Sequence, residues 1–157
     1  MNIAYSLEKI NLQNVFFLDS KKNIIMDGKF TKIIYSDSLI STSGISAVVP
    51  FRNTSIDKTS NRNILKFPST DLTNVRLSTE LIDIERDIID YYKNLSQSNK
   101  TPVLTLRDHI KNGCIKIYRE SFNPKNVVRY VVKISGIWED QYRIGLTYKF
   151  IETYPLI

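Results

Sequence analysis

A chain of 157 residues with 42% hydrophobic residues is long enough to bury a core, and we expect residues 1–157 to form a single domain. The lone Cys114 excludes an internal disulfide, and one histidine, His109, leaves too few soft ligands for a structural zinc site. A formal net charge of +6 favours a polyanionic partner.

The first half of the chain predicts short strands divided by turns. Residues 19–23 are a polar turn, and Asp27-Gly28 is a strong hairpin signal. Residues 36–44 form a polar loop, and residues 52–63 are polar and basic with almost nothing to bury, so we expect a mobile loop there. The predicted strands are residues 15–18, 24–26, 29–36, 45–51 and 64–67.

The apolar spacing predicts one long helix at residues 79–99. Leu81, Ile84 and Ile88 recur at steps of three and four, and acidic residues cover the opposite face. Ser78 or Thr79 can cap its N-terminus. Of the seven charged residues in this helix five are acidic, so the predicted helix is acidic and the rest of the chain is basic.

The remainder returns mostly to β-structure. Residues 103–110 fit either a strand or a short helix, Asn112-Gly113 ends that element, and residues 114–120 form a strand. A turn at residues 123–126 leads to a hairpin over residues 128–150. This order predicts a mainly β fold, an OB-like barrel with one long amphipathic helix inserted between strands, because a short antiparallel sheet avoids open edges by curling shut.

Side-chain alternation gives the final hairpin one apolar face and one cationic face. The apolar face consists of Val128, Tyr130, Val132, Ile134, Trp138, Tyr142, Ile144, Leu146, Tyr148 and Phe150. We interpret these residues as the core of the barrel. The other face carries the basic residues, with Lys116 and Tyr118 sharing a register on the preceding strand.

Cations interleaved with aromatic residues suit a single-stranded nucleic acid, since Lys and Arg attract phosphates and every base has a face that can stack. Tyr35 and Phe51 are stacking candidates off the core register of the hairpin, as is Phe122. The predicted nucleic-acid site is Arg129, Lys133, Arg143, Lys149, Lys116, Tyr118, Tyr35, Phe51, Arg52 and Arg62. The alternative interpretation is that the basic residues are the ordinary solvent face of a half-buried sheet.

We expect no catalytic centre, no metal and no cofactor, and therefore no enzyme. Cys114 opens an apolar strand, five residues from His109, with no activating base evident for a nucleophile. With five glycines the chain has no Gly-rich phosphate-binding motif. The acidic pair Glu139-Asp140 and the acidic row of the helix lie where solvated charge is common, at a hairpin tip and on a helix surface.

The C-terminal hairpin resembles that of OB-fold single-stranded DNA-binding proteins, of the kind encoded by large cytoplasmic DNA viruses and virus-like cytoplasmic linear plasmids. The resemblance rests on a strand ending Gly-Ile-Trp-Glu, a brief polar turn, and a strand with Ile-Gly-Leu-Thr-Tyr-Lys-Phe, within residues 134–151. Trp138, Gly145 and Tyr148 match the shared pattern. The final Tyr-Pro-Leu-Ile differs from the acidic tail by which many such proteins recruit partners. Replication proteins stay open as partners, because this apolar ending could dock elsewhere.

The resemblance implies sequence-independent binding of single-stranded DNA during DNA replication, through a basic groove and base stacking. Two alternatives stay open: an RNA-binding module, and a structural or assembly protein that forms homo-oligomers through its sheet. The first residues lack a signal peptide and no run approaches the roughly 20 apolar residues that span a bilayer, so we expect a soluble, cytoplasmic protein without a membrane partner.

Overall fold

The computed structural model describes residues 3–25, 27–59, 62–119 and 129–153. Two α-helices are present in this part of the chain, α1 (Leu72–Ser96) and α2 (Thr105–Lys111), with two short 3-10 helices, η1 (Leu7–Lys9) and η2 (Leu12–Asn14). The strands are β1 (Tyr5–Ser6), β2 (Val15–Phe17), β3 (Lys21–Asn23), β4 (Gly28–Ser36), β5 (Ser41–Ser43), β6 (Ile45–Val48), β7 (Ser55–Thr59), β8 (Arg62–Lys66), β9 (Thr101–Val103), β10 (Cys114–Arg119), β11 (Arg129–Glu139) and β12 (Arg143–Thr153).

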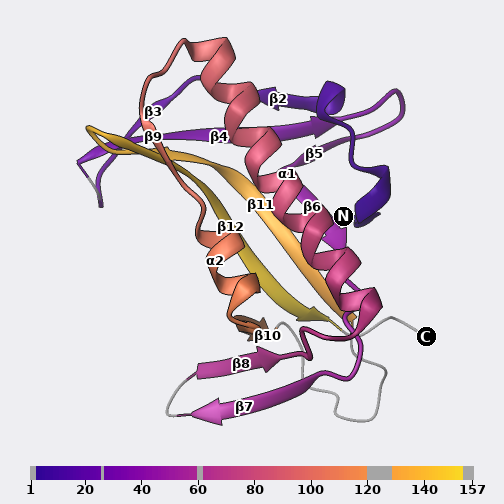
Figure 1. The fold of residues 1–157 in the computed structure, drawn as a ribbon. Coiled ribbons are helices and arrows are strands. Elements are labelled where there is room, and N and C mark those ends of the chain that lie inside the picture. Colours follow the sequence, from indigo (N-terminus) through magenta and orange to yellow (C-terminus); the bar gives the residue numbers. More distant parts are fainter. Residues whose placement is uncertain (1–2, 26, 60–61, 120–128, 154–157) are drawn as a thin grey trace.

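The long hairpin of β11 and β12 is the centre of one large sheet, and Figure 1 shows it strongly bent behind α1. On the side away from β12, β11 pairs with β6 through residues 131–134 and with β4 through residues 136–139. On the side away from β11, β12 pairs with β9 through residues 143–145 and with β10 through residues 150–152. Each central strand therefore changes its neighbour midway along its length.

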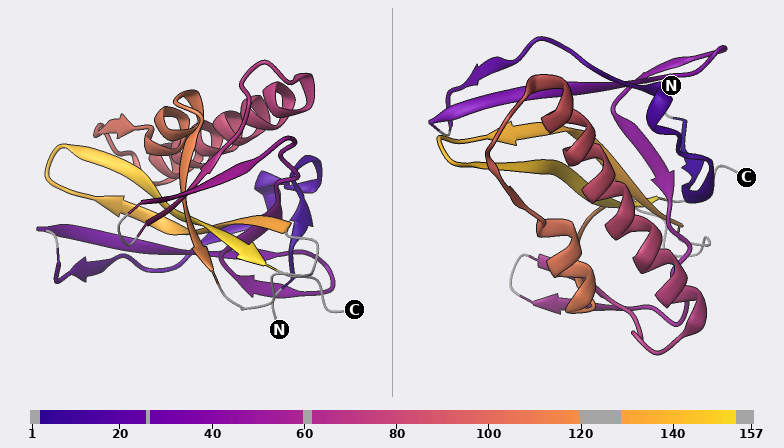
Figure 2. Two further views of the ribbon diagram at one scale, coloured as in Figure 1. Left: turned by 90° about the horizontal axis from the view of Figure 1, so that it is seen from below. Right: turned by 45° about the horizontal axis from the view of Figure 1, so that its top comes forward.

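Both α-helices lie on the same face of the sheet, as the left view of Figure 2 shows. We call this face the helix-side face and the opposite one the outer face, which neither α-helix covers. The core fills the helix-side face with buried residues of the sheet and the helices: Ile33, Tyr35, Val132, Ile134, Ile137, Ile144, Leu146, Phe150, Leu77, Leu81, Ile88, Ile89, Leu106 and Ile110. Each large apolar side chain buried in this way contributes about 1.5–3 kcal/mol.

The predicted barrel is corrected to an open sheet, although its strand-rich character and single long helix are confirmed. Among the described residues twelve strands join one sheet whose main path runs β1-β6-β11-β12-β10-β8-β7, and its two ends do not pair with each other. Short strands protect an open edge, and β1 has only two residues. Closure is also opposed by β2, β3 and β5, which all extend the sheet from β4.

The long helix begins at Leu72, about two turns before the predicted start. Asp71 is its N-cap, with a carboxylate that accepts the N–H of Asn74 at 3.1 Å. Two positions are buried in these turns, the apolar Leu77 and the polar Asn74, and Asn74 interrupts the apolar repeat. Its amide binds the backbone of Arg52 and the carbonyl of Pro68. The helix ends before Gln97, whose left-handed φ of 53° closes the last turn.

Three segments predicted as turn or loop contain strands, and the polar loop predicted at residues 36–44 contains β5. Residues 21–23 form β3, while Ile24 and Ile25, predicted as a strand, are 99% and 95% exposed in the turn that follows. The polar segment predicted as a mobile loop contains β7 and the start of β8, and β8 pairs with both β7 and β10. Strand pairing uses backbone groups, so polar residues suffice once a neighbouring strand is present.

The other predicted strands are confirmed apart from their ends, and residues 103–110 contain the end of β9 and most of α2. Gly113 follows α2 with a φ of +63°, as its predicted role in ending that element requires. The predicted turn at residues 123–126 and Phe122 lie outside the described residues. Neither α-helix in the described ranges combines the length and the apolar composition needed to cross a membrane.

A β-bulge between Ile134 and Gly136 reverses the alternation of β11. Before the bulge Val132 and Ile134 face the helices as predicted, but after it Ile137 and Glu139 take that side. Trp138 therefore lies on the outer face and does not belong to the core. The alternation of β12 is confirmed, except that Tyr142, at 71% exposed, lies in the turn before the strand.

Glu139 is buried on the helix-side face, in contrast to the solvated position expected at a hairpin tip. Its carboxylate accepts a hydrogen bond of 2.9 Å from the hydroxyl of Tyr92. The ammonium groups of Lys100 and Lys29 lie 3.3 and 3.8 Å from its two oxygens. A buried carboxylate needs such partners, so Glu139 serves to join α1 to the hairpin.

Candidate nucleic-acid interface

Three lysines form one row across the outer face of β11, β12 and β10. Lys133 is directly opposite Lys149, and the pairing of Ile117 with Phe150 places Lys116 beside Lys149. Like charges directly opposite each other destabilise a sheet. In the part of the chain that the structure describes, none of the three makes an ion pair with a carboxylate. The row is therefore available to an external anion.

Tyr118 stands beside this row with its side chain 45% exposed. The ammonium nitrogens of Lys116 and Lys149 lie 4.9 and 5.9 Å from the centre of its ring. In the antiparallel pairing of β10 with β8, Ile117 lies opposite Asn63. The next position along both strands therefore places Arg62 beside Tyr118 on the same face. We call Lys133, Lys149, Lys116, Tyr118 and Arg62 the basic strip.

A cleft of about 340 Å³ opens beside the basic strip, at the edge of β12 between β9 and β10. Its walls combine aromatic, imidazole and ammonium groups. The polar and aromatic lining includes Lys116, Lys149, Tyr118, Trp138, His109 and Tyr148. The cleft thus joins the basic strip to aromatic rings on both sides of the hairpin edge.

His109 reaches the cleft from α2, and its Nδ1 lies 2.5 Å from the hydroxyl oxygen of Tyr148. Burial, followed by the negative charges of Glu85 and Asp108, raises the pKa of Tyr148 well above its usual range. Tyr148 therefore stays a neutral phenol that can donate or accept a hydrogen bond.

Glu85 of α1 fixes the position of α2. Its two carboxylate oxygens accept the backbone N–H groups of Leu106 and Arg107, each at 2.9 Å. These are two of the N–H groups that the first turn of a helix leaves without partners, so a buried side chain from another helix caps α2. Burial raises the pKa of Glu85 despite these two bonds, which favour the charged form.

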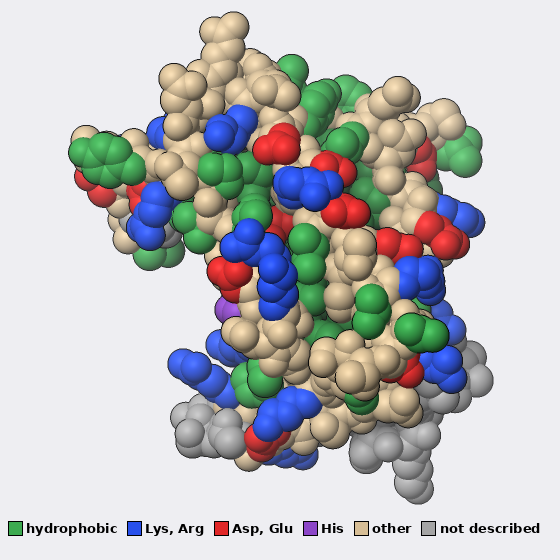
Figure 3. Space-filling model, in the orientation of Figure 1, with side chains coloured by type: hydrophobic (Ala, Val, Ile, Leu, Met, Phe, Trp, Pro, Cys, Tyr) green, Lys and Arg blue, Asp and Glu red, His purple; other side chains and the backbone are tan. Residues whose placement is uncertain are grey.

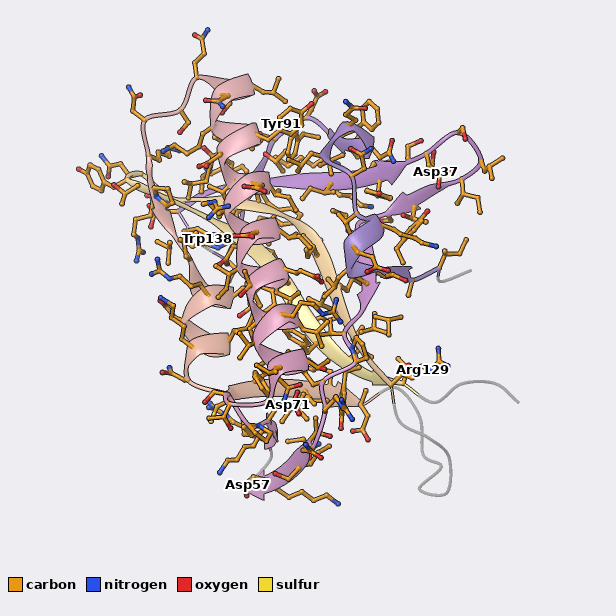
Figure 4. All side chains as sticks on the ribbon, turned by 45° about the vertical axis from the view of Figure 1, so that its right-hand side comes forward. Asp37, Asp57, Asp71, Tyr91, Arg129 and Trp138 are labelled. Atoms are coloured by element: carbon orange, nitrogen blue, oxygen red, sulfur yellow. The ribbon has the colours of Figure 1, made fainter. Side chains whose placement is uncertain are left out.

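Arg143 and Arg129 lie away from the basic strip. Arg143 contacts Trp138, with 5.9 Å between the guanidinium carbon and the ring centre, but its guanidinium is held 2.7 Å from the carboxylate of Asp140. Arg129 is exposed on the outer face at the start of β11, where it pairs with Thr153. Figure 4 shows Arg129 and Trp138 at opposite ends of the bent hairpin.

Two of the predicted site residues are buried, and Arg52 lies apart from the basic strip. Tyr35 is 1% exposed and its hydroxyl accepts the N–H of Asn11, so its ring is a core side chain. Phe51 is 8% exposed and stacks on Phe67 with ring centres 4.1 Å apart. Neither has a face open to a base. Arg52 is exposed, but its backbone is bound to α1 on the helix side, away from the strip.

On the front face of the molecule, where α1 lies, positive and negative side chains intermingle (Figure 3). The charge separation predicted between helix and body is therefore incomplete on that face. Among the described residues, no group of three or more His, Cys, Asp or Glu side chains could hold a metal ion.

Sequence reasoning missed Trp138, Tyr148 and His109 as residues of the cleft. The available signal was Gly136 two residues before Trp138, because glycine inside a strand often marks a bulge. No protein-family model matches this chain, and no curated protein or solved structure matches it either. Its function is therefore argued from the site itself.

Proposed function

We propose that this chain binds single-stranded DNA without sequence preference, through the basic strip and the adjoining cleft. The observation that carries the proposal is the row of Lys116, Lys149 and Lys133, neighbours in register without carboxylate partners among the described residues. Phosphates of a bound strand would relieve the repulsion within this row. Lysine acts on phosphate as a point charge, which supplies affinity without reading sequence.

The aromatic residues favour a single strand over a duplex. Tyr118 is half-exposed, and both it and Trp138 line the cleft. Stacking on such rings contributes about 1–3 kcal/mol per base, but only where a base is free of its own stack. Duplex DNA offers its phosphates and keeps its base faces covered.

The DNA assignment comes from the resemblance of the hairpin, since phosphate attraction and stacking act equally on RNA. The test is fluorescence anisotropy with labelled strands of about 15 nucleotides. Oligothymidylate, oligouridylate and a duplex are compared between about 50 and 200 mM salt, where three to five phosphate contacts predict a loss of about 10- to 100-fold. Affinity independent of salt would contradict the proposal, as would tighter binding of the duplex, and tighter binding of oligouridylate would reassign the partner to RNA.

Two matched variants distinguish binding at the basic strip from a general effect of net charge on affinity. The triple variant Lys116→Ala, Lys133→Ala, Lys149→Ala should lose most of the affinity and flatten the salt slope by about two. The control Lys9→Ala, Lys93→Ala, Lys111→Ala has the same change in net charge at lysines outside the strip. Equal losses in the two variants would show that only net charge matters and would exclude the strip as the site.

A further inference from the structure

The cleft coincides with an interruption in the pairing of β12. Residues 146–149 lie between the segment that pairs with β9 and the segment that pairs with β10, and no strand of the described residues pairs with them on that side. Thr105 and His109 of α2 line the cleft there. The interruption is four residues long, about 13 Å of strand, which is too short for another strand of ordinary length.

The backbone groups that face this interruption follow from the hairpin geometry. The carbonyl of Arg143 accepts the N–H of Asp140, so it points toward β11. The carbonyl of Tyr142 accepts the N–H of Thr101, so it points toward β9. Because successive residues of a strand direct their N–H and C=O groups to opposite sides, Leu146 and Tyr148 direct theirs to the side of β9 and β10. The N–H of Leu146 completes the parallel pairing of Gly145 with Val103, so the cleft receives the carbonyl of Leu146 and both the N–H and the carbonyl of Tyr148.

The cleft therefore has three kinds of contact within about 340 Å³, near the lower end of the range for small-ligand sites. Trp138 and Tyr118 supply aromatic rings, Lys116 and Lys149 supply positive charge, and the strand edge supplies backbone donors and acceptors. A nucleotide is the ligand that uses all three, through its planar base, its phosphate and the polar edge of its base.

We infer that the cleft is a subsite for one nucleotide of the bound strand, with its base turned out of the stack and inserted between β9 and β10. The inference rests on the proposed function and adds where a base is held. The base edge bonds to the backbone of Leu146 and Tyr148, and the phosphate lies at Lys116 and Lys149. Backbone groups that both donate and accept can serve any base, which agrees with binding without sequence preference.

Trp138 is the single tryptophan of the chain, so its fluorescence reports on the cleft. The experiment compares oligothymidylate with an abasic strand of the same length and charge. We expect oligothymidylate to quench the emission, and the abasic strand to bind about tenfold more weakly without quenching. Equal affinity of the two strands with unchanged emission would overturn the subsite and leave the proposed function standing. Failure of both strands to bind would overturn the proposed function itself.

The variant His109→Ala tests the same point at an exposed residue, where folding is not at risk. It removes the partner of the Tyr148 hydroxyl and one wall of the cleft. Its affinity for oligothymidylate should fall about three- to tenfold while its affinity for the abasic strand stays at the wild-type value. An equal loss for both strands would contradict a base in the cleft. The control is Asn112→Ala, exposed just after α2.

Discussion

Trp138 lies across Gly145 on the neighbouring strand, so that a Cβ atom added to Gly145 would lie 2.5 Å from two atoms of the indole ring. The two residues are direct partners in the register of the hairpin. A large aromatic residue that covers a glycine on the opposite strand compensates for the missing side chain. This contact holds the indole at the wall of the cleft.

The substitution Gly145→Ala should therefore displace Trp138. We expect a loss of about 1–3 kcal/mol in the free energy of unfolding, together with a red shift of the emission as the indole moves into water. Urea unfolding followed by fluorescence measures both quantities. Thr147→Ala on the same face of β12 is the control, and an unchanged midpoint and emission in Gly145→Ala would contradict the contact.

Arg143 and Lys149 carry the same charge on the same face of β12, but only Arg143 is held by a carboxylate, that of Asp140. Lys149→Ala should weaken binding of oligothymidylate by about three- to tenfold, whereas Arg143→Ala should change it by less than about twofold. Anisotropy at one low salt concentration compares them at equal net charge. The reverse order would place the phosphate path at the hairpin tip and not across the strip.

Glu85 should make the protein less stable as the pH rises. Its pKa in the folded state is raised above the ordinary value of 4.5 by burial, so the folded state retains a proton that the unfolded state has lost. The free energy of unfolding is then highest below pH 4.5 and falls as the pH rises through the elevated pKa. Relative to Glu85→Gln, which does not titrate, the wild type should lose stability over this range in urea titrations. A difference that grows with pH would show that the capping bonds outweigh burial.

Asn74 should be among the most sensitive polar positions. Its buried amide accepts the N–H of Arg52 at 2.7 Å and donates to the carbonyls of Arg52 and Pro68 at 2.9 and 3.0 Å. Asn74→Ala leaves these backbone groups without their partner, so we expect a loss of about 3 kcal/mol in the free energy of unfolding. Ser78→Ala on the same helix is the control, with an expected change under about 0.5 kcal/mol. Similar midpoints for the two variants would show that water replaces the amide.

Local periodicity predicted the long helix from residue 79 onward and the alternation of β12, because the 3.6-residue and two-residue repeats depend only on backbone geometry and on which side meets the core. It placed Lys116, Tyr118, Lys133 and Lys149 on one face correctly. It failed for Tyr35 and Phe51, since an aromatic residue in a strand is equally suited to a core and to a surface until the packing partner is known.

Tertiary structure decided the rest. The bulge before Gly136 moves Trp138 to the outer face, and it exists because β11 must leave β6 and join β4 within one strand. The polar residues of β7 and β8 become a hairpin because β10 offers its edge to β8. The cleft arises because β9 and β10, separated by α2 in the chain, both pair with β12 and leave residues 146–149 between them. A periodic pattern in the sequence contains no information about pairing between strands that are far apart in the chain. Side-chain alternation therefore determined the two faces of the hairpin, and the tertiary structure determined which residues lie together on them.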